Sequence, residues 1–127
     1  MRILHTEFQS NNAEATSDFL TAMLGLPARQ EATQIGPLFT LQADAETTLS
    51  VRTKQDHERA PGTTVYFETE DVSSSLLRAE ALGATVIVPK MTFAGRGYIG
   101  WVEAPGSVYM AFLQVDASVS TTGEAAE

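Results

Sequence analysis

The chain has 127 residues, 43% hydrophobic and 19% charged, which fits one globular domain able to bury a core without crosslinks. It has no cysteine, so disulfides, thiolate metal sites and a cysteine nucleophile are excluded. A formal net charge of −8 argues against binding to nucleic acid or to anionic membranes. No apolar stretch is long enough for a signal peptide or a membrane span, so we expect a cytoplasmic location.

The first half of the chain predicts a strand, a helix and three further strands. Residues Met1–Phe8 alternate β-forming side chains, and a polar break then precedes a helix over Ala13–Leu24 that Gly25 ends. Turn residues separate three short apolar stretches, each of which predicts a strand. These stretches are Glu31–Ile35, Leu38–Gln42 and Thr47–Arg52.

The second half repeats this order after a charged linker over residues 54–62. A strand over Thr63–Glu70 leads to a helix that Asp71 caps and Gly83 ends. Three further strands are expected, the first stopped by Pro89 and the last two forming a hairpin. They are Ala84–Val88, Tyr98–Glu103 and Val108–Gln114.

Each predicted helix has one apolar face that we expect to pack on a sheet. The first helix places these side chains on that face: Ala15, Phe19, Leu20, Met23 and Leu24. The second helix places these: Val72, Leu76, Ala79 and Leu82.

The repeated order predicts an internal duplication. We therefore expect an α+β fold of two βαβββ modules, about 1–53 and about 63–115, within one domain over 1–115. Curved mixed sheets of this kind are expected to form a cleft, where ligand pockets occur. Residues 116–127 are small and polar and are predicted to be a disordered tail.

Several segments in this order resemble the vicinal-oxygen-chelate superfamily, which includes glyoxalase I, bleomycin-resistance proteins and extradiol dioxygenases. Residues 1–6 and 17–26 (SDFLTAMLGL) resemble the opening of a bacterial glyoxalase I. Residues 65–72 and 81–86 resemble the opening of the family's second module, and residues 101–107 (WVEAPGS) resemble its late turn. The resemblance spans nearly the whole chain to Gln114 and implies the βαβββ duplication already described.

In glyoxalase I a divalent metal is held by side chains on the first and last strand of each module. Carried over, these positions fall on His5, Ser50, Thr64 and Ala111. A shifted register gives Arg52 for the second position and Met110 for the fourth. Only His5 keeps a family ligand, and neither Ala111 nor Met110 can bind a hard divalent ion.

The broken ligand set means that we expect no cofactor. A divalent metal at His5 is the least favoured alternative, as is a displaced site built from His5, Glu7 and Glu68.

Charged and aromatic side chains share the alternation of these positions. Glu7 and Arg52 lie on the same side of their strands as His5 and Ser50. They therefore either form a salt bridge on the wall of a hydrated cavity or bind a polar ligand. Tyrosines in the second module share the side of Thr64 and Ala111 and suit a flat organic ligand. For Trp101, plain packing is the favoured interpretation. The full predicted ligand-binding set is Ser50, Arg52, Thr64, Tyr66, Glu68, Tyr98, Trp101, Tyr109 and Ala111.

The leading functional hypothesis is a small-molecule-binding protein of the glyoxalase and bleomycin-resistance type that lacks the standard metal ligands. The alternative is a metal-independent isomerase, lyase or epimerase in which His5 or Glu7 transfers a proton. A metal-dependent glyoxalase or dioxygenase ranks below both. A small organic ligand is the expected partner, and the resemblance implies a homodimer whose modules pair across or within chains.

Overall fold

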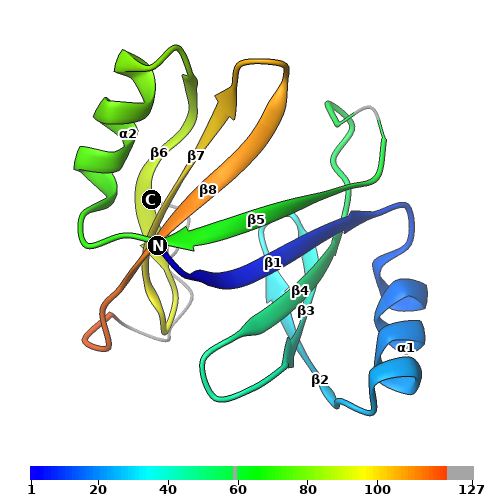
Figure 1. The fold of residues 1–127 in the computed structure, drawn as a ribbon. Coiled ribbons are helices and arrows are strands. Elements are labelled where there is room, and N and C mark those ends of the chain that lie inside the picture. The colour runs from blue at the N-terminus through cyan, green and yellow to red at the C-terminus, as the bar shows by residue number, and fades with distance from the viewer. Residues whose placement is uncertain (59, 120–127) are drawn as a thin grey trace. The chain divides into compact units, whose positions relative to one another are not determined.

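The computed structural model describes residues 1–58 and 60–119, and Figure 1 shows its eight strands and two helices. The chain divides into two compact units. The first unit is Leu4–Val65, and the second combines Met1–Ile3 with the chain from Tyr66 onward. Neither helix in these described residues is long and apolar enough to cross a membrane.

The first unit is a sheet in the order β2-β3-β4-β1 with one helix packed on it. β1 runs parallel to β4, with His5 opposite Thr48 and Glu7 opposite Ser50. The helix begins where the Asn12 side chain accepts a hydrogen bond from the Ala15 amide. The elements are β1 (Ile3–Ser10), α1 (Ala13–Leu24), β2 (Ala28–Thr33), β3 (Gly36–Gln42) and β4 (Thr48–Thr53).

The second unit repeats this arrangement with the strand order β5-β8-β7-β6, although the part of β5 before Tyr66 belongs to the first unit. β5 runs parallel to β8, with Tyr66 opposite Ala111. Its core lies between α2 and the sheet and is built from Val72, Leu76, Val102 and Phe112. The elements are β5 (Gly62–Glu68), α2 (Val72–Ala81), β6 (Thr85–Phe93), β7 (Gly97–Ala104) and β8 (Val108–Val115).

The predicted α+β fold with two βαβββ modules is confirmed. The cleft, the module boundaries and the extent of the single domain stay predictions. In the predicted disordered tail, the Asp116 amide donates a hydrogen bond to the Arg96 carbonyl, and residues 120–127 lie outside the described part.

Two strand boundaries were predicted wrongly. β2 begins at Ala28 and ends before Ile35, because the Thr33 hydroxyl closes a turn onto the Gly36 carbonyl. β6 does not stop at Pro89 but continues to Phe93. Proline is tolerated there because β6 is the last strand in the sheet order and shifts register on both sides of Val88, so no ladder bond requires its missing amide.

The apolar face of α1 was also predicted wrongly. Phe19, Met23 and Leu24 are exposed, whereas Ala13 and Ser17 are buried and Leu20 packs against the core. Ala13, Ser17 and Leu20 follow the spacing i, i+4 and i+7, and the small side chains of Ala13 and Ser17 let the helix approach the sheet closely. In α2 the prediction holds for Val72, Leu76 and Ala79, but Leu82 lies at the helix end and is exposed.

Gly97, the first residue of β7, is predicted to accept no side chain. Its φ is 150°, and a Cβ there would collide with the backbone carbonyl oxygen of Gln114 on β8. We expect Gly97→Ala to lower the free energy of unfolding by about 3 kcal/mol or more, because two backbones must separate. Gly106→Ala is the control: φ is 90° but nothing lies within 4 Å of the new Cβ, so the loss should be about 1–2 kcal/mol. Urea unfolding measures both, and equal losses would contradict the steric argument.

Candidate functional site

One face of the first unit carries a set of buried polar side chains. On β1 and β4, Phe8 and Val51 point to α1 and join its core. Strand alternation therefore sends the neighbouring odd residues of β1 and even residues of β4 to the helix-free face. The buried polar residues of β1 and β4 on that face are His5, Glu7, Gln9, Thr48, Ser50 and Arg52, and the Thr64 hydroxyl on β5 joins them through Gln9. We call this set the polar face.

His5 lies between two hydroxyl groups of β4. Its Nδ1 is 2.5 Å from Thr48 Oγ1, and its Nε2 is 2.8 Å from Ser50 Oγ. Both ring nitrogens therefore have protein partners within the first unit, and the ring is 2% exposed. To bind a metal or a proton-donating substrate, His5 must first exchange one of these hydroxyl partners.

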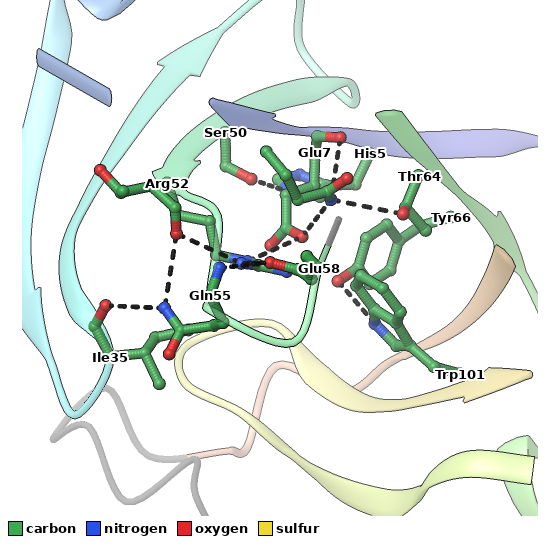
Figure 2. Close-up of polar contacts among 12 residues, drawn as sticks. His5, Glu7, Ile35, Ser50, Arg52, Gln55, Glu58, Thr64, Tyr66 and Trp101 are labelled. Atoms are coloured by element: carbon green, nitrogen blue, oxygen red, sulfur yellow. Dashed lines mark hydrogen bonds and ion pairs between the residues drawn. The ribbon is translucent and has the colours of Figure 1, made fainter. Parts of the chain in front are cut away.

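A three-member charged cluster occupies the middle of the polar face (Figure 2). Arg52 Nε donates to Glu7 Oε1 at 3.2 Å. The two terminal nitrogens of Arg52 donate to the two carboxylate oxygens of Glu58 at 2.8 and 2.7 Å. Side chains of all three are at most 11% exposed. One guanidinium thus binds two carboxyl groups, one from a strand and one from the loop after β4.

Gln9 extends this cluster toward β5. Its side-chain amide nitrogen donates to Glu7 Oε1 at 2.7 Å and lies 3.3 Å from the Thr64 hydroxyl. In the described residues, no buried side-chain nitrogen or oxygen lacks a hydrogen-bond partner. Each fully buried polar atom of the described cluster therefore has a partner within the protein.

The two carboxyl groups of the cluster have opposite pKa shifts. Burial raises the pKa of Glu7, and the attraction of Arg52 and the hydrogen bond from Gln9 only partly oppose this. The bidentate hydrogen bonds from Arg52 lower the pKa of Glu58. For Arg52, desolvation is outweighed by its bonds to Glu58 and the charge of Glu7, so its pKa is raised. Of the two carboxyl groups, Glu58 is therefore held more firmly in its charged form, and Glu7 is the one more easily protonated.

The second unit carries an aromatic cluster on its helix-free face. Trp101 Nε1 donates to the Tyr66 hydroxyl at 2.9 Å, and their rings meet edge to face with centroids 5.9 Å apart. The Tyr109 ring lies 6.2 Å from that of Trp101. Ala111 is opposite both Tyr66 and Trp101, while Met110 packs on the α2 side. Ala111 therefore lies on the helix-free face of the second unit, and Met110 lies on the opposite face.

Two predicted ligand-binding residues have other surroundings. Tyr98 packs against the core under α2, and the Lys90 ammonium lies 4.4 Å from its ring centroid. Glu68 accepts hydrogen bonds from Arg2 at 2.7 and 3.1 Å at the surface, and this contact lowers the pKa of Glu68. Neither residue joins the polar face or the aromatic cluster through a described contact.

The donor set does not fit the divalent metal of the glyoxalase type. Within the first unit His5, Ser50 and Thr64 offer one imidazole and two neutral hydroxyls, and Ala111 offers no donor. Among the residues that the structure describes, no group of three or more histidine, aspartate or glutamate side chains is placed to hold a metal ion.

Comparison with known proteins gives the fold. No protein-family profile and no curated protein matches the chain. A Streptomyces coelicolor methylmalonyl-CoA epimerase variant in complex with 2-nitronate-propionyl-CoA matches with a TM-score of 0.68 at 18% identity, over 98% of both chains. The Mn(II)-bound glyoxalase from Novosphingobium aromaticivorans matches with a TM-score of 0.71 at 14% identity, over 97% of this chain and 40% of the glyoxalase.

A variant of 4-hydroxymandelate synthase from Streptomyces coelicolor matches with a TM-score of 0.68 at 21% identity. The match covers 94% of this chain, which spans only 39% of the synthase. The chain has the vicinal-oxygen-chelate fold. At these identities the likeness establishes the fold and leaves the chemistry to the residues of the chain itself.

Two residues of this hydrogen-bonded network were missed from the sequence, Glu58 of the charged cluster and Gln9 beside it. Gln9 follows the same alternation as His5 and Glu7, so its place on the polar face could have been predicted. Glu58 could not, because it lies in the charged segment that was interpreted as a linker and has no periodic pattern. Its position depends on how the loop after β4 folds back.

The raised pKa of Glu7 predicts that removing its charge increases the stability of the folded protein by an amount that depends on pH. Folding stabilises the protonated form of Glu7, so its contribution is present at low pH and is lost as pH rises through the raised pKa. Glu7→Gln keeps an acceptor for Gln9 and Arg52. We expect its stability relative to wild type to rise with pH, reaching about +1 kcal/mol at pH 8. A loss of stability at pH 8 would instead mean that attraction to Arg52 outweighs burial.

Glu58→Gln should have the opposite effect. The lowered pKa of Glu58 means that its stabilisation is present above the ordinary glutamate pKa and is lost as pH falls through the lowered one. At pH 7 we expect a loss of about 2 kcal/mol, because the variant leaves a buried guanidinium without its bidentate partner. Urea titrations between pH 3 and 8 measure the difference, and a loss that stays constant over that range would contradict the assignment.

Proposed function

We propose that this chain is a small-molecule-binding protein whose ligand binds at the polar face of the first unit without a metal chelate. The observation that carries the proposal is the buried cluster of Glu7, Arg52 and Glu58. Each buried ion costs several kcal/mol of desolvation, and apolar side chains of similar size would fill the same space at least as stably. A charged cluster on the helix-free face therefore favours a binding role over a purely structural one.

The chemistry of the cluster favours a polar organic ligand. Arg52 supplies a planar fork of donors, and the hydroxyls of Ser50 and Thr64 can donate or accept. In the second unit, Tyr66, Trp101 and Tyr109 offer aromatic surface of the kind that flat ligands stack on. We propose binding or sequestration of such a compound, as in the bleomycin-resistance type. A homodimer, a cytoplasmic location and the absence of nucleic-acid or membrane partners belong to the same proposal.

A second candidate function is proton transfer by Glu7, as in a metal-independent isomerase, lyase or epimerase. Among the described carboxyl groups with a shifted pKa, Glu7 is the one whose pKa is raised, as a general base working near neutral pH requires. Glu7 would take a proton from the carbon next to a carbonyl. The electron pair of the C–H bond forms a C=C bond with the carbonyl carbon, and the π pair of the carbonyl moves to its oxygen, where Arg52 stabilises the negative charge. Return of a proton to the carbon restores the carbonyl. The epimerase match over 98% of both chains supports this candidate.

The metal-free part of the proposal is tested by metal content and melting temperature. Protein purified without chelator should hold far less than one equivalent of metal. Added Ni²⁺, Zn²⁺, Mn²⁺ or Fe²⁺ should shift the melting temperature by less than about 1 °C, because no ligand set binds the folded state selectively. His5→Ala is the control. Near-stoichiometric metal, or a shift of several degrees that His5→Ala abolishes, would overturn the proposal.

The proton-transfer candidate is tested by deuterium exchange. Methylmalonyl-CoA is incubated with the protein in D₂O, and NMR follows loss of the proton at the carbon between its two carbonyl groups. If Glu7 is the base, exchange should increase as pH rises through its raised pKa, and Glu7→Gln should slow it at least about 100-fold. Glu31→Gln, an exposed site on β2, should have no effect. Wild-type exchange no faster than buffer would count against catalysis on this substrate and leave binding as the function.

A further inference from the structure

The Arg52 side chain presents a preformed fork toward the loop after β4. This loop, residues Lys54–Glu58, is called the 54–58 loop. Both terminal nitrogens of Arg52 bind the two oxygens of the Glu58 carboxylate, at 2.8 and 2.7 Å, as Figure 2 shows. Parallel bonds of this kind are the geometry in which a guanidinium recognises a free carboxylate.

The fork is held in place independently of Glu58. Arg52 Nε donates to Glu7 Oε1, and Glu7 is in turn fixed by the amide of Gln9. Arg52 Nη1 also lies 3.4 Å from the Thr53 carbonyl oxygen. These contacts come from β1 and β4 themselves. The Arg52 guanidinium therefore keeps its orientation when the Glu58 carboxylate leaves.

The far end of the 54–58 loop is held to the sheet through that one carboxylate, whereas its start is held by the Lys54 amide and the Gln55 side chain. Glu58 Oε1 accepts the Gln55 amide at 2.6 Å, and the Glu58 amide donates to the Gln55 carbonyl at 2.9 Å. Lys54 Nζ donates to the Glu58 carbonyl, and the Gln55 side chain reaches the carbonyls of Ile35 and Thr53 at 3.3 and 3.4 Å. Asp56 and His57 are exposed. Among the described residues, the contacts that hold the loop against the sheet are the Lys54 amide on the Ser10 carbonyl at 2.7 Å, the Gln55 side chain, and the Glu58 carboxylate on Arg52.

We propose that the Arg52 fork is a binding site for the carboxylate of a small organic acid, and that Glu58 occupies the place of that carboxylate until the ligand displaces it. The inference rests on the proposed binding function and names its ligand class. The exchange replaces one carboxylate by another, so the charge beside Arg52 and its two hydrogen bonds are conserved. The tethered Glu58 competes at the high local concentration typical of a short flexible link, which weakens ligand binding by a corresponding factor.

The experiment uses benzoate as the probe, benzamide as its uncharged analogue, and calorimetry on the full chain. Wild type should bind benzoate and not benzamide. Glu58→Gln should bind benzoate at least about tenfold more tightly, because the competing carboxylate is gone. Asp56→Asn removes the same charge from the same loop and should bind as wild type does. Arg52→Lys keeps the positive charge but loses the fork, and should bind at least about tenfold more weakly.

A second measurement needs no variant. In wild type, benzoate should increase hydrogen exchange at the Gln55 amide, because that amide loses its Glu58 acceptor. If benzoate binding depends on Arg52 but neither tightens in Glu58→Gln nor changes exchange at Gln55, displacement of Glu58 is wrong although the binding site stands. If neither wild type nor Glu58→Gln binds benzoate through Arg52, the carboxylate site is overturned. Binding of benzamide at the polar face would then still support the broader proposed function.

Discussion

The first unit is organised around the need of one buried guanidinium for a counter-charge. Arg52 points away from α1 because strand alternation fixes its side, and a buried cation must then be paired. Glu7 lies on the parallel neighbour β1, yet burial disfavours its ionised form. The chain completes the pair with Glu58, brought by the loop after β4. The lowered pKa of Glu58 and the place of the loop end beside Arg52 follow from this pairing, whereas the raised pKa of Glu7 follows from its burial.

The two units share one topology but differ in chemistry on their helix-free faces. In the first unit these positions carry charges, hydroxyls and an imidazole, joined by hydrogen bonds. In the second unit the corresponding strands carry Tyr66 and Trp101 around Ala111, joined mainly by ring contacts. In the first unit, Thr48 and Ser50 lie within hydrogen-bond distance of the two ring nitrogens of His5, and in the second unit Ala111 offers no donor atom.

The fold was predictable from the sequence because its signals are local. Capping residues such as Asn12 and Asp71, together with alternating strands, place every element within a few residues. The site was predictable where it follows alternation, as for Glu7 and Arg52. It was not predictable where it depends on how a loop folds back, as for Glu58, or on how deeply a helix sits. Phe19 and Met23 satisfy an apolar stripe, but the small residues Ala13 and Ser17 determined which side of α1 approaches the sheet.

Pro89 has a consequence beyond the length of its strand. A terminal strand with a continuous row of free amides and carbonyls is a template on which a strand from another molecule can add. β6 ends the sheet order, but Pro89 contributes no amide, and the register shifts beside Val88 twist the strand out of a flat ladder. Pro89 and the register shifts, which made β6 hard to recognise in the sequence, therefore also protect this edge strand against edge-to-edge aggregation.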